Sequence, residues 1–131
     1  MATAEFRRVF VEKVALAGGT DTGGGVGAWQ NPHENAVIVK GITIDLTTAA
    51  SAACTIDCGT TATSAVTSSD NLIDGLDVNA ATGVFDNITD KGTNGKSRQR
   101  LASGKWITFS RASGASAGLV GTAFIEYYVV A

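Results

Sequence analysis

The sequence is poor in residues that bind metals or act as nucleophiles, because its 131 residues include one histidine and two cysteines. Cys54 and Cys58 lie four positions apart, and on a strand this spacing places them on one face about 13 Å apart. That distance is too long for a disulfide. A zinc site needs roughly four ligands, and His33 is the only histidine available. We therefore predict buried, reduced cysteines, no metal centre and no cofactor.

Neither sign of charge dominates, since 10 Lys and Arg face 12 Asp and Glu for a net charge of −2. A basic footprint is missing, so we expect no nucleic-acid partner and no membrane surface as partner. The longest apolar run, at the C-terminus, is interrupted by Thr122 and Glu126 and is too short to span a bilayer. The N-terminal residues lack the apolar core of a secretion signal, which predicts synthesis in a cytoplasm.

Proline occurs once and glycine 16 times, a composition that suits short strands and tight turns better than long helices. The clearest pattern covers residues 35–61, where apolar and polar residues alternate on both sides of a turn at 49–51. This period of two is typical of a sheet with one buried face. We predict that the two runs form a central hairpin. The alternating apolar residues are Ile42, Ile44, Leu46, Cys54, Ile56 and Cys58.

The first of these runs begins with a change of phase. Val37 and Val39 fall on the strand face opposite Ile42 and Ile44. We therefore expect that end of the strand to be covered on both faces, with a bulge at Gly41.

The rest of the chain reads as short strands separated by polar loops. Residues 5–17 alternate without a purely apolar face and are interpreted as a strand or extended arm, ended by the glycine-rich stretch that follows. The C-terminal segment is apolar on both faces, which is typical of a central strand or of a strand at a subunit interface. Further strands are expected over 26–32, 84–85 and 105–112, and polar loops over 62–83 and 86–100.

These elements predict an all-β fold, a single jelly-roll-like β-sandwich of about seven or eight strands with an N-terminal arm. Residues 1–20 form the arm or first strand, and residues 21–131 form the sandwich domain. No internal repeat and no second domain are evident.

Several short motifs match catalytic patterns without the context that those patterns need. Asp21-Thr22-Gly23 matches the aspartic protease triplet but lies between glycines, so a turn is favoured. Ser116 stands in a G-x-S-x-G pattern, yet no histidine follows it, and a hairpin turn over 114–118 is the better interpretation. Gly95-Lys96-Ser97 lacks the earlier glycine of a P-loop. A small hydrolase using Asp21 or Ser116 remains an alternative.

Aspartates are frequent in the two polar loops, and calcium prefers several carboxylates. Their spacing does not match an EF-hand loop, and roles in Asx turns are favoured. Asn87-Ile88-Thr89 is also a glycosylation sequon, which has meaning only in a eukaryotic secretory route. The aspartates are Asp70, Asp74, Asp77, Asp86 and Asp90.

Five segments together resemble one protein family, and they cover nearly the whole chain after the first twenty residues. They are GGGVGAWQNP (23–32), VIVKGITIDLTT (37–48), SSDNLIDGLDV (68–78), GVFDNITDKGTNGKSRQR (83–100) and GLVGTAFIEYYV (118–129). The family is that of capsid decoration (cement) proteins of tailed bacteriophages.

The resemblance implies a jelly-roll-like β-sandwich that binds the major capsid protein on the capsid exterior of a virion, often as a homotrimer. No catalytic residue belongs to the family pattern, so the chain is not expected to be an enzyme. We expect the N-terminal segment to contact the shell and aromatic residues to form the subunit interface. The candidate capsid contacts are Phe6, Arg7, Arg8 and Phe10. The candidate interface residues are Trp29, Phe124, Tyr127 and Tyr128.

A second class of function stays open. A tail-fibre or receptor-binding tip module has a similar sandwich shape and recognises glycan on the host surface. Such a module needs an exposed aromatic residue in a groove.

Overall fold

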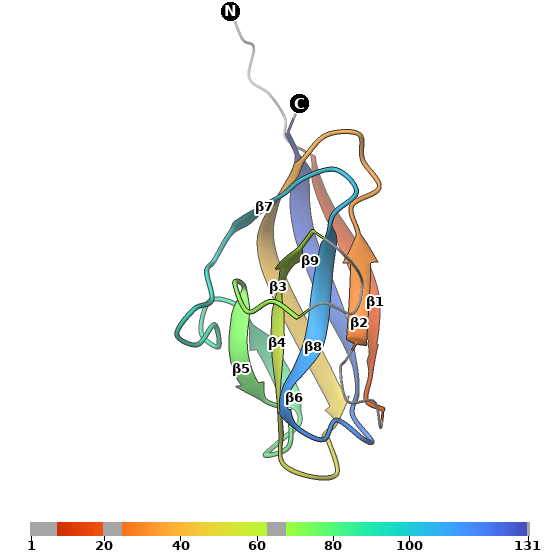
Figure 1. The fold of residues 1–131 in the computed structure, drawn as a ribbon, viewed down its shortest axis with the longest axis vertical. Coiled ribbons are helices and arrows are strands. Elements are labelled where there is room, and N and C mark those ends of the chain that lie inside the picture. The colour runs from red at the N-terminus through yellow and green to blue at the C-terminus, as the bar shows by residue number, and fades with distance from the viewer. Residues whose placement is uncertain (1–7, 20–24, 63–67, 131) are drawn as a thin grey trace, which may run out of the picture.

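The computed structural model describes residues 8–19, 25–62 and 68–130. Over these residues the chain forms nine strands and no helix, arranged as two antiparallel sheets packed together (Figure 1), so the predicted all-β sandwich is confirmed. Within this part of the chain no helix could cross a membrane. The strands are β1 (Val9–Ala17), β2 (Gly25–Gln30), β3 (Val37–Thr48), β4 (Cys54–Thr61), β5 (Ile73–Asp77), β6 (Gly83–Asp86), β7 (Gln99–Leu101), β8 (Trp106–Gly114) and β9 (Val120–Val129).

The strands pair in a nested order. Sheet A runs β1-β9-β3-β6, with the short β7 also beside β3, and sheet B runs β2-β8-β4-β5. Early strands therefore pair with late ones, β1 with β9 and β2 with β8, while β3 pairs with β6 and β4 with β5. Most connections take the chain from one sheet to the other. The same order results when a long antiparallel hairpin is folded so that its paired strands alternate between two sheets.

The predicted central hairpin is wrong, because β3 and β4 belong to different sheets. β3 pairs with β9, β6 and β7, whereas β4 pairs with β8 and β5. Residues 49–53 cross from one sheet to the other, and so do residues 115–119, which makes the hairpin turn predicted around Ser116 wrong as well. Each strand on either side of these two crossings buries one of its faces. The alternation of apolar and polar residues along such a strand is the same whether the next strand pairs with it in one sheet or packs against it from the other sheet.

A bulge in β3 explains the change of phase at its start. The register against β9 shifts between Val39 and Gly41, which confirms the predicted bulge. The extra residue reverses the alternation, so Val37, Val39, Ile42 and Ile44 all face the core and are at most 1% exposed. The prediction that both faces are covered at this end is therefore wrong.

The core fills the space between the sheets and holds both cysteines as free thiols. Burial raises the pKa of the Cys54 and Cys58 thiols, which keeps them protonated and unreactive. Two strands lie in segments predicted as polar loops. β5 carries the buried Leu76, and β7 is a three-residue strand that raises the strand number above the predicted seven or eight.

Candidate functional site

The outer face of sheet A carries the apolar surface of the molecule. Because side chains alternate along a strand, the odd residues of β9 face the core and the even ones face outward. Five large hydrophobic side chains are exposed among the described residues, and four of them lie at the two edges of this sheet. These four are Val9 and Val11 on β1, Val84 on β6 and Ile88 just after it; the fifth is Val120 on β9.

The candidate interface residues separate into two groups. Phe124 and Tyr128 lie half-buried on the outer face of β9, where a partner could cover them. Tyr127 faces the core and is 1% exposed, so its side chain is not available to a neighbouring subunit. Its ring packs against Trp29, with 4.9 Å between centroids, and Trp29 is itself half-buried.

The candidate capsid contacts are only partly within the structure. Phe6 and Arg7 lie outside the described residues. Arg8 is exposed, and its guanidinium lies over the ring of Phe10 at 5.4 Å. Phe10 in turn stacks on Tyr127, with 5.2 Å between centroids and 13° between ring planes. Arg8 and Phe10 therefore lie together, as the prediction requires of a shared contact surface. The Phe10 ring, however, packs against the edge of the core.

A hydrogen-bonded group that the sequence did not reveal lies beneath Phe10. The Tyr127 hydroxyl lies 3.0 Å from Nε2 of His33 and donates to Oε1 of Glu12 at 3.4 Å. Burial, the charge of Glu12 and this hydrogen bond raise the pKa of Tyr127 to about 12. The three residues come from β9, the β2–β3 loop and β1, so the group joins these elements. Because the residues are far apart in the chain, no sequence motif could have predicted the group.

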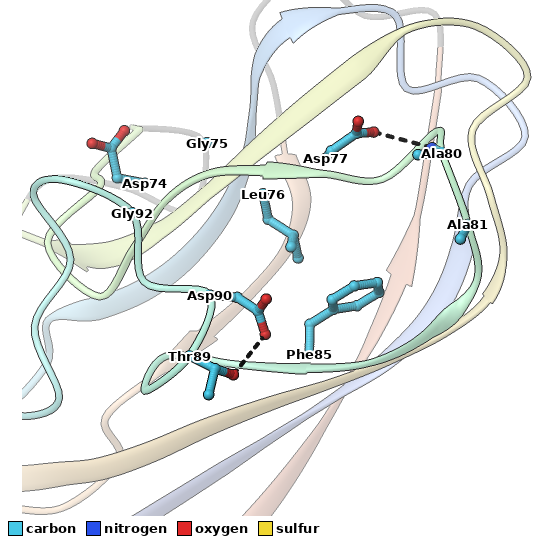
Figure 2. Close-up of a pocket in the computed structure, with 10 residues that line it drawn as sticks. All are labelled: Asp74, Gly75, Leu76, Asp77, Ala80, Ala81, Phe85, Thr89, Asp90 and Gly92. Carbon is cyan, nitrogen blue, oxygen red and sulfur yellow. Dashed lines mark hydrogen bonds between the residues drawn. The ribbon is translucent and has the colours of Figure 1, made fainter.

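A pocket of about 440 Å³ opens at the opposite side of the sandwich, between β5 and β6. Figure 2 shows Leu76 and Phe85 projecting into this space from the two strands, with Asp90 beside them. Asp74 and Asp77 also line it. The pocket thus has an apolar floor and an acidic rim, at the place where the edges of the two sheets do not pair.

The aspartates of this region hold loops in place. Asp77 accepts hydrogen bonds from the backbone N–H groups of Asn79 and Ala80, at 2.9 and 3.1 Å (Figure 2 shows the bond to Ala80). Asp86 accepts from the N–H groups of residues 88 and 89, which lowers the pKa of its carboxyl. The predicted Asx-turn roles are therefore confirmed for these two. Within the described ranges no three His, Cys, Asp or Glu side chains gather as a metal site would require.

Ser116 is not placed beside His33, the histidine that a serine nucleophile would need. The Ser116 hydroxyl is buried, accepts from the N–H of Gly19 at 3.2 Å and donates to its carbonyl at 3.3 Å. Ser116 precedes the start of β9, whereas His33 contacts Tyr127 near the other end of that strand. Asp21-Thr22-Gly23 lies outside the described residues.

Comparison of the chain with family models, with curated proteins and with solved structures finds no match. The resemblance to phage decoration proteins therefore stays a prediction.

Proposed function

We propose that the chain is a virion structural protein that decorates and stabilises a phage capsid. In this role it binds the shell of the major capsid protein as a homo-oligomer. The family resemblance implies that this oligomer is a trimer. The observation that carries the proposal is the outer face of sheet A, where Val9, Val11, Val84 and Ile88 are exposed at both edges. Exposed apolar side chains at both edges of one sheet offer surface that a protein partner could bury.

We also infer that the sandwich is a jelly roll. A jelly roll is a double sheet of eight strands made by wrapping antiparallel pairs. The four nested pairs β1–β9, β2–β8, β3–β6 and β4–β5 agree with this arrangement. β7 adds a ninth strand beside β3.

Light scattering and capsid co-sedimentation test the proposal. The purified chain is expected at three times the mass of the protomer, and it is expected to sediment with undecorated capsids of its phage and to raise their melting temperature. Failure to bind such capsids at micromolar concentration contradicts the decoration role. Gene neighbours that encode a major capsid protein would add independent support.

The N-terminal contact to the shell is tested by truncation. Residues 9–12 belong to β1, so removal of residues 1–12 also takes Phe10 and Glu12 away from Tyr127. Deletion of residues 1–7 leaves β1 whole. We expect this deletion to weaken capsid binding without changing the urea midpoint, and unchanged binding contradicts a contact through Phe6 and Arg7.

One observation favours a glycan-binding tip as the second candidate. The Phe85 ring beside the Asp90 carboxylate offers an apolar surface for the ring of a sugar and an acceptor for its hydroxyl groups. A glycan array tests this directly. Binding that is lost in Phe85→Ala and kept in Val120→Ala would support the tip module, whereas no binding on the array contradicts it.

A further inference from the structure

We propose that the pocket between β5 and β6 binds an organic cation, which is an ammonium or guanidinium group on an apolar stem or ring. A lysine or arginine side chain of a partner protein carries such a group, and so does an amino sugar. Each of the two candidate functions therefore supplies one source of the ligand. The positive charge of the ligand is the same in both cases and does not depend on which function holds.

The pocket lies at the open side of the sandwich. On the other side β2 approaches β1 so closely that a Cβ added at Gly27 would lie 2.9 Å from the carbonyl oxygen of Ala15. On this side β5 ends sheet B and β6 ends part of sheet A, and the two strands do not pair. The space between them is about 440 Å³. This volume is in the range of about 300–1,000 Å³ that is usual for small-molecule sites.

The walls of the pocket are apolar and include one aromatic ring. Leu76 is 6% exposed and belongs to the core, and Phe85 is half-buried and packs against it. Both side chains project into the space from their strands (Figure 2). The face of an aromatic ring attracts a cation, and the methylene stem of a lysine or arginine packs well on an apolar side chain. The two walls therefore suit the two parts of such a ligand.

Asp90 places a fixed carboxylate beside these walls (Figure 2). Its Oδ2 accepts from the backbone N–H of Asp86 at 3.0 Å and from the hydroxyl of Thr89 at 3.1 Å. These bonds hold the carboxylate in one orientation. No described residue donates to its other oxygen, Oδ1, which is thus available to an N–H donor of a ligand.

The charge around the pocket has one sign. Three aspartates and no lysine, arginine or histidine line it. Asp74 and Asp77 lie at the rim and point away from Phe85 (Figure 2). None of the three is paired with a cation, since the one ion pair among the described residues joins Lys40 and Glu126. The exposed cations that follow in the chain, none of which lines the pocket, are Lys91, Lys96, Arg98 and Arg100.

This combination selects a cation over other ligands of similar size. An apolar ligand would cover the Asp90 carboxylate without giving it a partner, which is costly. An anionic ligand would be repelled by the same carboxylate. A neutral sugar would donate hydroxyl groups to Oδ1, but hydrogen bonds between two ionised groups are roughly twice as strong as neutral ones. An ammonium or guanidinium group therefore gains most from the site.

Pairs of charged and neutral probes test the proposal. N-acetyl-arginine amide is compared with its neutral analogue N-acetyl-citrulline amide, and methyl glucosaminide with methyl glucoside. Backbone amide shifts in ¹H–¹⁵N NMR spectra of the whole chain report binding at residues 76, 85 and 90. At least one charged probe is expected to bind there at least about tenfold more tightly than its neutral analogue. Binding of only the arginine or only the glucosamine probe identifies the source of the cation.

Two variants separate the carboxylate from the ring. Asp90→Asn keeps the shape and the oxygen acceptor but removes the charge, and it is expected to weaken binding of the charged probe at least about tenfold. Phe85→Leu keeps an apolar wall without the ring and is expected to weaken it about two- to tenfold. Asp45→Asn is the matched control, because Asp45 is half-buried on β3 and does not line the pocket. It is expected to bind as the wild type does.

Three results would overturn the proposal. They are the absence of shifts at the pocket with both charged probes, equal affinity for charged and neutral probes, and unchanged affinity in Asp90→Asn. Circular dichroism checks that each variant is folded. Capsid co-sedimentation and the glycan array test the candidate functions separately, so a failure there leaves the charge of the pocket ligand as measured by the probes.

Discussion

Tyr127 and His33 are 94 positions apart in the sequence, and the hydroxyl oxygen of Tyr127 lies 3.0 Å from Nε2 of His33. The contact fastens the β2–β3 loop to β9, the strand that lies between β1 and β3 in sheet A. Phe10 packs against both rings, at 5.2 Å from Tyr127 and 5.4 Å from His33 between centroids. The first strand, a loop and the last strand therefore depend on one buried hydroxyl group.

Replacement of Tyr127 by Phe is expected to lower the free energy of unfolding by about 1–3 kcal/mol, because it removes a buried hydrogen-bonding group from its partners. Urea unfolding followed by tryptophan fluorescence measures the change. Tyr128→Phe, at a half-buried site on the outer face, is the control and is expected to have the smaller effect. Equal effects of the two substitutions would contradict the role given to the Tyr127 hydroxyl.

Tyr127 also makes the stability of the folded protein depend on pH in the alkaline range. Burial, with the charge and hydrogen bond of Glu12, raises its pKa from the ordinary 10.0 to about 12. The folded state therefore binds the phenolic proton more tightly than the unfolded state. The resulting stability is complete below pH 10 and is lost as the pH rises from about 10 to about 12, by up to about 2–3 kcal/mol.

Urea midpoints between pH 8 and pH 12 measure this loss, and the difference in absorbance at 295 nm between the wild type and Tyr127→Phe follows the ionisation of Tyr127. The wild type should lose more stability than Tyr127→Phe over this range. Ionisation of Tyr127 near pH 10 in the folded protein would show that its hydroxyl is not held as described.

Asn87 is expected to be among the most sensitive polar residues. It is fully buried, its Oδ1 accepts from the N–H of Ile42 at 2.9 Å, and its Nδ2 donates to the carbonyls of Lys96 and Ser97 at 2.9 and 3.1 Å. Asn87→Ala leaves these backbone groups without their partner and should cost about 2–4 kcal/mol. Differential scanning calorimetry measures it, with the exposed Asn94→Ala as the control, expected below about 1 kcal/mol.

Two glycines separate the cost of backbone conformation from the cost of close packing. Gly104 and Gly114 both have a φ of +75°, but a Cβ at Gly104 meets nothing within 4 Å, whereas one at Gly114 lies 1.9 Å from the carbonyl oxygen of Ala53. Gly104→Ala should cost about 1–2 kcal/mol from conformation alone. Gly114→Ala should cost about 3–5 kcal/mol, because overpacking is added. Similar melting temperatures for the two variants would contradict this difference.

Local pattern predicted most of the strands and their buried faces. Ile107 and Phe109 alternate with polar residues in β8, and both are fully buried. The bulge at Gly41 could also be predicted from the sequence, because the alternation of apolar and polar residues changes phase there. The short β7 was missed because its three residues sit in a polar stretch and are paired with β3 by tertiary contact rather than by their own propensity.

The candidate site residues were harder to predict. Alternation places Tyr127 and Tyr128 on opposite faces of the last strand, but both faces are apolar, so the pattern did not show which of the two faces the core. One faces the core and the other faces outward, as alternation requires once the register of β9 is known. The two edges of sheet A could not be recognised either, because an edge is defined by which strands lack a neighbour.

The amino-acid sequence by itself determined the β-sandwich class and the inward-facing residues of most strands, because alternation and β-branched composition act over a few residues. Tertiary structure alone decided that β3 and β4 lie in opposite sheets, that Tyr127 meets His33, and that exposed valines gather at the edges of one sheet. These relationships join residues far apart in the chain. Their free energy comes from burying shared surface, which no local segment can specify.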